Sequence, residues 1–163
     1  MTTPTYTVHY RRKREGKTDY KKRLQLLKSQ KPRLVLRLTN KQLIAQLTTY
    51  NPDGDKVLFT VNATNLEEKG WDYSKNSLPA AYLTGAIVAK KAKEENIEEA
   101  ILDVGLQTPH RGGKLFAALK GTIDAGLDVP ANKNVFPSTK RIRGEHIDET
   151  LATDFDEIKQ EIL

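Results

Sequence analysis

The sequence predicts an α/β fold, with a mixed sheet flanked by two helices, a basic amino-terminal arm and an acidic carboxyl-terminal helix. Three runs of alternating apolar side chains in residues 33–62 indicate an antiparallel meander. From residue 78 onward the apolar period changes from two to about 3.6, which adds helices and a βαβ-like portion. Charge is unevenly distributed: the first 33 residues hold eleven basic and two acidic groups, and the remaining 130 hold sixteen and nineteen.

The basic arm spans residues 1–32. Thr18 or Asp19 is suited to cap a short helix over about residues 20–28, because their side-chain oxygens accept hydrogen bonds from free backbone N–H groups. Leu24 and Leu27 are three residues apart and predict one apolar side for this helix. The proline of Lys31-Pro32 ends it, since the residue before proline avoids the helical region.

The core domain is predicted over residues 33–126 and begins with the sheet. Its first turns lie at Asn40-Lys41 and at residues 51–54, where Asn, Pro, Asp and Gly are typical of a tight reversal. Three strands are expected around these turns: residues 33–39, 42–50 and 56–62. Each strand alternates between two faces, so the pattern favours a sheet with one buried side.

Two helices and a fourth strand complete the predicted core. Ser77 is a plausible cap for a helix over residues 78–92, whose small residues allow a close approach to the sheet. Residues 100–104 are a short apolar run typical of a buried strand. A second helix is expected over residues 114–125, and Gly126 is well placed to end it.

The carboxyl-terminal part, residues 127–163, combines an irregular basic segment with an acidic end. Residues 145–163 carry seven acidic groups and one lysine, with a weak helical pattern that we expect to pack on the core. Two further interpretations stay open for this helix. It is either a docking surface for a basic neighbouring protein or a surface on which the basic arm folds back until the arm's own partner binds.

Composition excludes several classes of protein. There is no cysteine, so disulfides and cysteine-based zinc sites are excluded. No apolar run approaches the roughly 20 residues of a membrane helix, and the amino terminus lacks a signal-peptide pattern. The three histidines, His9, His110 and His146, are scattered. We therefore expect a soluble, cytoplasmic protein with no catalytic site, metal, cofactor or small-molecule substrate.

Two glycine-containing segments partly match the pattern of a phosphate-binding loop. Gly16-Lys17-Thr18 resembles the end of such a loop, but Arg11 stands where its first glycine is required. Gly112-Gly113-Lys114 lies better, just before a helix, yet Leu115 replaces the hydroxyl residue that would hold magnesium. A plain turn or an RNA-backbone contact through His110, Arg111 and Lys114 is the better interpretation of this loop.

The arm itself favours nucleic acid as partner, because its basic residues alternate with Tyr6, Tyr10 and Tyr20, whose rings can stack on unpaired bases. A solvated, disordered tail is the structural alternative. Two functional classes stay open at this point: a general RNA-binding protein, and a nucleotide- or nucleic-acid-processing α/β enzyme. The enzyme would depend on Asp103 or Lys114.

Several segments, taken together, resemble the archaeal and eukaryotic type of large-subunit ribosomal protein eighteen. The most informative are RRKREGKTDY at 11–20, KPRLV at 31–35, TPHRGGK at 108–114 and KRIRGEHI at 140–147. Further matches lie at residues 39–46, 116–121 and 124–127. The segments cover nearly the whole chain in order, and the lack of a long carboxyl-terminal extension favours the archaeal type.

This resemblance implies a structural role without catalysis in the central protuberance of the large ribosomal subunit. It implies binding to 5S rRNA, with further contacts to 23S rRNA and to neighbouring ribosomal proteins. The candidate RNA-binding residues in the arm and first strand are Tyr10, Arg11, Arg12, Lys13, Arg14, Lys17, Thr18, Tyr20, Lys21, Arg23, Arg33 and Arg37. Those in the turns and the basic segment are Asn40, Lys41, His110, Arg111, Gly112, Gly113, Lys114, Lys140, Arg141 and Arg143.

Overall fold

The computed structural model describes residues 7–163, so Tyr6 lies outside the described residues. Its centre is a four-stranded sheet in the order β3-β2-β1-β4. The strands are β1 (Arg33–Leu38), β2 (Leu43–Thr49), β3 (Lys56–Asn62) and β4 (Ile101–Asp103). The first three form an antiparallel meander, and β4 runs parallel to β1. The predicted mixed sheet is therefore confirmed.

Alternation along the strands separates two faces of the sheet. Leu34 and Leu36 of β1 point to the same side as Ala45 and Leu47 of β2, and all four are fully buried. The opposite side carries Arg33, Val35 and Arg37 of β1, opposite Thr48, Gln46 and Ile44 of β2. We call the first side the core face and the second the open face. This difference places the hydrophobic core on one side only.

Two helices cover the core face: α3 (Leu78–Glu94) and α4 (Lys114–Asp124). Ser77 accepts a hydrogen bond from the backbone N–H of Ala80, as expected of an N-cap. The helices pack closely because glycine stands at their contact. A Cβ atom on Gly85 would lie 2.0 Å from the carbonyl oxygen of Ala118, which no side chain tolerates.

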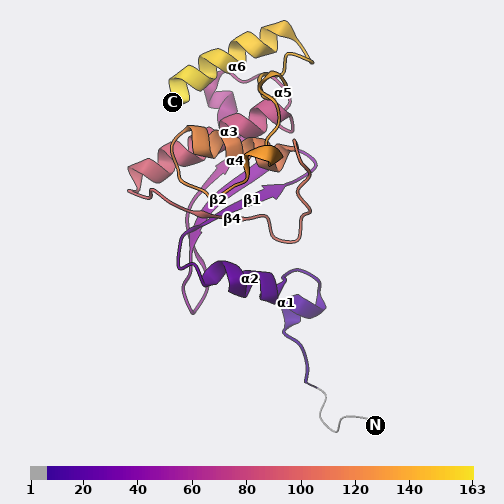
Figure 1. The fold of residues 1–163 in the computed structure, drawn as a ribbon, viewed down its shortest axis with the longest axis vertical. Helices are drawn as coiled ribbons and strands as arrows, with labels where there is room; N and C mark the ends of the chain where they lie inside the picture. Colours follow the sequence, from indigo (N-terminus) through magenta and orange to yellow (C-terminus); the bar gives the residue numbers. More distant parts are fainter. Residues whose placement is uncertain (1–6) are drawn as a thin grey trace.

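Helices α5 (Thr139–Arg143) and α6 (Glu149–Ile162) form a further layer outside α3 (Figure 1). The short 3-10 helix η2 (Lys133–Val135) lies beside the loop that precedes α4. Leu151, Phe155, Ile158 and Ile162 of α6 belong to the same buried cluster as the sheet and α3. The apolar face of this acidic helix is therefore packed against the core, while Glu157 and Glu161 are exposed.

The remaining elements belong to the arm and to the connection between β3 and α3. The arm holds α1 (Arg11–Arg14) and α2 (Tyr20–Leu27), and the connection holds the 3-10 helix η1 (Ala63–Lys69). In Figure 1, α1 and α2 lie below the sheet, away from α3 and α4. The arm is thus placed at the open face.

Candidate nucleic-acid interface

The first helix of the arm presents a concentrated positive charge. All four residues of α1 are basic and exposed, and none of them is buried. Lys13 and Arg14 have no ion-pair partner among residues 7–163. Arg12 Nε donates a hydrogen bond of 2.9 Å to Thr18 Oγ1, which fixes one arginine of this turn. Such a cluster of exposed guanidinium and ammonium groups is suited to an anionic chain.

The tyrosines of the arm stand next to this charge. The rings of Tyr10 and Tyr20 lie 5.2 Å apart between centroids, and Tyr10 is 73% exposed. Lys17 pairs with Glu15 at 2.9 Å, while Lys21 has no such partner in the described part of the chain. Basic and aromatic groups therefore lie next to one another in the arm, and stacking of the tyrosines on bases stays a prediction.

The second helix begins where the sequence indicated, because Asp19 accepts hydrogen bonds from the backbone N–H groups of Lys21 and Lys22. The expected apolar side, made of Leu24 and Leu27, is wrong in part. Leu24 is 58% exposed. Leu26 instead lines the space between the helix and the sheet.

Ion pairs and a polar contact hold α2 on the open face. Both terminal nitrogens of Arg23 donate to the carboxylate of Asp55, at 2.6 and 2.7 Å, in the forked geometry that arginine favours. Lys22 Nζ donates to the carbonyl oxygen of Gly105 at 2.9 Å. The helix is therefore tied both to the β2–β3 turn and to the segment after β4.

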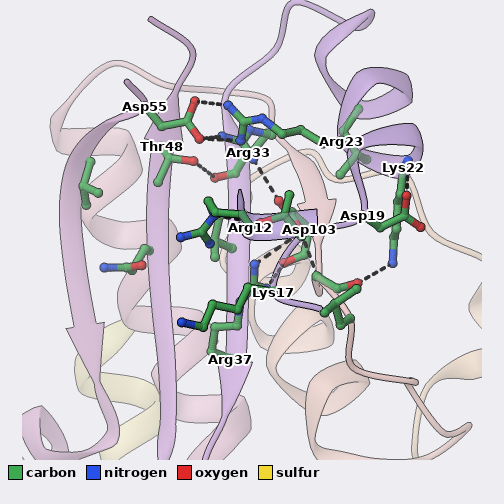
Figure 2. Close-up of a pocket in the computed structure, with 17 residues that line it drawn as sticks. Arg12, Lys17, Asp19, Lys22, Arg23, Arg33, Arg37, Thr48, Asp55 and Asp103 are labelled. Carbon is green, nitrogen blue, oxygen red and sulfur yellow. Dashed lines mark hydrogen bonds and ion pairs between the residues drawn. The ribbon is translucent and has the colours of Figure 1, made fainter. Parts of the chain in front are cut away.

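The ion pairs continue into the sheet as a network of three arginines and two aspartates. Arg33 donates to Asp55 through Nη2 and to Asp103 Oδ2 through Nη1, the second bond measuring 2.9 Å. Arg37 Nη1 donates to the carbonyl oxygens of Leu36 and Asp103, both at 2.9 Å. Figure 2 shows this network at the floor of a cavity beneath the arm.

The network changes the acidity of its members. The hydrogen bond from Arg23 lowers the pKa of Asp55, and Arg33 adds to this effect, although partial burial of the carboxylate opposes it. The same bond raises the pKa of Arg23. Asp55 is therefore held as a carboxylate, and α2 stays tied to the sheet at neutral pH.

These contacts give three predicted RNA-binding residues another partner. Arg33 is only 4% exposed, and its guanidinium is shared between Asp55 and Asp103. Arg23 and Arg37 are also paired, and their side chains are 28% and 38% exposed. No residue near Arg23 in the sequence points to Asp55, which lies in a turn 32 positions away. Asp103, the residue considered for catalysis, is bound by two arginines instead.

A second set of predicted residues gathers at the amino-terminal end of α4. Lys114 Nζ donates to Asn76 Oδ1 at 2.9 Å, and Asn76 Nδ2 donates to the carbonyl oxygen of Asn40 at the same distance. Gly113 is the N-cap residue of α4. The turn at Asn40 and the loop before α4 therefore form one surface, although 74 positions separate Asn40 from Lys114.

The basic carboxyl-terminal segment joins this surface through the glycine loop. The N–H of Gly112 donates to the carbonyl oxygen of Val135 at 2.9 Å. A Cβ atom on Gly112 would lie 3.8 Å from Nη1 of Arg141, so that guanidinium sits beside the loop. We call this set the loop cluster. Its exposed members are Lys41, His110, Arg111, Lys140 and Arg141.

Arg143 lies apart from the loop cluster in its contacts. It pairs with Asp156 of α6 and, at 2.7 Å, with Glu145. The hydrogen bond to Asp156 raises the pKa of Arg143. This predicted RNA contact therefore also joins α5 to the acidic helix.

Two classes of site are missing from the described residues. Within residues 7–163, no group of three or more histidine, aspartate or glutamate side chains is arranged to hold a metal ion. No helix in that range has the length and apolar character needed to cross a membrane.

Comparisons with known proteins point to one family. The family model for "Ribosomal large subunit proteins 60S L5, and 50S L18" matches residues 4–98 and 90–132. A protein of Korarchaeum cryptofilum is 51% identical over 142 residues, covering 87% of this chain and 73% of that protein. Proteins of Haloarcula marismortui and Halobacterium salinarum are 49% and 51% identical over 148 residues, or 91% of this chain and 79% and 81% of theirs. All three carry the name large ribosomal subunit protein uL18.

Proposed function

The chain belongs to the family of ribosomal large-subunit proteins 60S L5 and 50S L18, and on this basis we propose that it is a structural, non-enzymatic component of the archaeal large ribosomal subunit. In that role it binds 5S rRNA in the central protuberance. The observation that carries this function is α1, a single turn of four exposed basic residues presented away from the core. Such charge attracts RNA phosphates by releasing their counterions.

The two basic surfaces suggest a division of contacts. The arm supplies Arg11, Lys13, Arg14 and Lys21 to the phosphates of 5S rRNA, and Tyr10 offers an exposed ring to an unstacked base. The loop cluster adds a separate patch built from distant parts of the chain, which suits a second RNA segment such as 23S rRNA. The chain then bridges two RNA segments, and the acidic side of α6 suits a basic neighbouring protein.

Selectivity on this proposal comes from shape and a few bases. The major groove of an A-form helix is too narrow to be read by side chains, so 2′-hydroxyls, backbone geometry and unpaired bases must distinguish 5S rRNA from other RNA. The residues that the sequence predicted as RNA contacts remain candidates, except that Arg33 is assigned a supporting role. Arg33 is buried in an ion-pair network, so it supports the surface from below.

A truncation tests the proposed function. Removing residues 1–18 deletes α1 and spares Asp19, which caps α2. We expect the folded domain to remain, with strongly reduced affinity for 5S rRNA in a filter-binding assay. With about 6–8 phosphate contacts, the full chain should show a slope of log affinity against log salt of roughly −4 to −7. Unchanged affinity after truncation would refute the arm as the binding element.

Competition separates this function from general RNA binding. At physiological salt, 5S rRNA should displace an unrelated structured RNA of equal length from the full chain. Equal affinity for both would favour an RNA-binding protein that acts without ribosomal specificity.

A further inference from the structure

The arm and the open face enclose a cavity of about 270 Å³. Its walls come from three segments far apart in the sequence. The arm contributes residues between 12 and 26, β1 to β3 contribute the floor, and the segment after β4 closes one side. Figure 2 shows Arg12, Lys17 and Arg37 around this space, below the Asp55–Arg33 pair. A cavity at this position belongs to the candidate RNA surface but is distinct from the outward side of α1.

The lining of the cavity has a surplus of positive charge. Six basic side chains face three carboxylates: Arg12, Lys17, Lys22, Arg23, Arg33 and Arg37, against Asp19, Asp55 and Asp103. Each carboxylate already accepts hydrogen bonds, Asp19 from the backbone of α2 and the other two from arginines. Lys17 pairs with Glu15 outside the lining at 2.9 Å, so two of the three surplus positive charges remain uncompensated.

Hydrogen-bond donors in the cavity wall also lack acceptors. Arg12 uses only Nε within residues 7–163, which leaves its two terminal nitrogens available. Arg37 is held in place by two carbonyl oxygens and lies against Gly105, where a Cβ atom would come within 2.9 Å of its guanidinium. The wall thus offers fixed donors to an anion.

Apolar atoms line the rest of the space. Leu26 projects from α2, Val35 and Val57 from the sheet, and Leu106 from the segment after β4. A phosphate ion alone would accept hydrogen bonds from the basic side chains but would make no contact with these apolar side chains. A nucleotide uses both, because it combines an anionic group with a flat, largely apolar base. The volume lies just under the 300–1,000 Å³ typical of small-molecule sites, so it admits about one nucleotide and excludes a duplex.

We propose that this cavity binds a single unstacked nucleotide of the bound RNA, with its phosphate at Arg12 and Arg37 and its base against Leu26, Val35 and Val57. The inference rests on the proposed function and makes it more specific. The arm then acts as one wall of a binding site in addition to supplying diffuse charge. It also assigns a role to the ion-pair network, which fixes the distance between that wall and the floor.

Two variants of α1 test the proposal with equal changes of charge. Arg12 lines the cavity, and Arg14 lies on the same helix outside it. In the full chain, Arg14→Gln should weaken 5S rRNA binding a few-fold and make the salt slope shallower by about one. Arg12→Gln should weaken binding about tenfold more than Arg14→Gln. The difference should persist at high salt, because a partly enclosed contact is less screened.

The three possible results have different meanings. A larger loss for Arg12→Gln supports the cavity. Equal losses leave the proposed function intact and overturn the cavity as a nucleotide site. No loss for either variant overturns both, since it removes the arm from the interface.

A second pair of variants keeps the charge constant, in case Arg12→Gln disturbs the arm through its bond to Thr18. Val57 is 45% exposed and lines the cavity, whereas Tyr50, which follows β2 and is 58% exposed, lies outside the lining. Val57→Trp should fill part of the space and weaken 5S rRNA binding about tenfold relative to Tyr50→Trp. Equal affinities of these two variants would show that the cavity stays empty in the complex.

The source of the nucleotide is tested with a free probe. Adenosine monophosphate and inorganic phosphate are titrated into the RNA-free full chain, and the amide resonances of the lining residues are followed by NMR. We expect at most weak binding of either probe, because the RNA supplies the nucleotide without a separate loss of translational freedom. Tight binding of the mononucleotide would overturn the assignment to RNA and identify a site for free nucleotides.

Discussion

The two faces of the sheet are covered by helices in different ways. On the core face, α3 and α4 pack through fully buried apolar side chains such as Leu36 and Val61. On the open face, α2 is held mainly by Arg23 and Lys22, and a cavity remains between helix and strands. The first contact is dry and closely packed, while the second is ionic and incompletely filled.

This difference separates stability from binding. Burial of apolar surface is the dominant favourable term in folding, so the core face should carry most of the free energy of unfolding. Partly buried ion pairs contribute little net stability, because desolvation offsets much of their attraction. They do fix geometry. The open face therefore has the properties of a positioned binding surface, with basic groups held in place and space left beside them.

Two valines give the largest and most direct test of the contrast. Val61 is fully buried on the core face, and Val35, 8% exposed, lines the cavity on the open face. We expect Val61→Ala to lower the free energy of unfolding by about 2–3 kcal/mol, from lost burial and a new void. Val35→Ala should cost about 1 kcal/mol, since a cavity is already present there. Urea denaturation measures both, and equal losses would contradict the distinction between the faces.

Asp55→Asn tests whether ion pairs hold α2. The change removes the charge that Arg23 and Arg33 share, so α2 should detach locally while the core stays folded. Hydrogen exchange should show protection of the α2 amides reduced by about tenfold, which corresponds to roughly 1.4 kcal/mol of local opening. Asp53→Asn, an exposed position in the same turn, is the matched control. Unchanged protection in Asp55→Asn would mean that Leu26 and its neighbours hold the helix.

The core was predictable because its signals are local. Alternation in residues 33–62 predicted the three strands to within one residue at each end, and Ser77 marked the start of α3. Strands and helix starts depend on the period of the apolar residues and on the capping residue, and both can be read from residues that are close together in the sequence. The apolar pattern of α6 also predicted its packing on the core.

The candidate site was less predictable because its contacts join distant residues. The Leu24–Leu27 spacing indicated an apolar side for α2, but the surface that receives the helix is ionic, so Arg23 decides its orientation. Nothing near Arg33 in the sequence indicates that Asp103, 70 positions away, will bury it. The loop cluster likewise depends on Asn76, which sequence analysis did not single out.

On acidification, the docking of α2 on the open face should be lost before the packing of α3 and α4 on the core face. Arg23 and Arg33 lower the pKa of Asp55 from its ordinary value of 3.8, so this carboxylate favours the docked state when it is charged. Its contribution is fully present above about pH 4 and is lost as the pH falls through the lowered pKa. NMR spectra of α2 should therefore change below pH 4 in the parent chain. The same resonances in Asp55→Asn should lack this step, and an identical step there would assign it to another carboxylate.

The smallest expected effect comes from Arg23→Lys, which keeps the charge and removes the fork. Arg23 reaches both oxygens of Asp55, whereas an ammonium group offers one point of contact. The pair is partly exposed, so solvent screening limits the loss to about 0.5–1 kcal/mol of α2 docking. Hydrogen exchange of the α2 amides measures it, with Lys21→Arg as the control at an exposed position without an ion pair in the described chain.

The consequence for RNA binding makes this small change informative. Arg23→Lys leaves the net charge of the arm unaltered, so diffuse attraction of phosphates predicts an unchanged salt slope and unchanged affinity. A cavity whose wall is positioned by the Arg23–Asp55 fork predicts a loss of affinity of a few-fold with the same slope, because only the geometry has loosened. If Arg23→Lys lowers the hydrogen-exchange protection of the α2 amides but leaves the affinity for 5S rRNA unchanged, docking of α2 is unrelated to RNA binding.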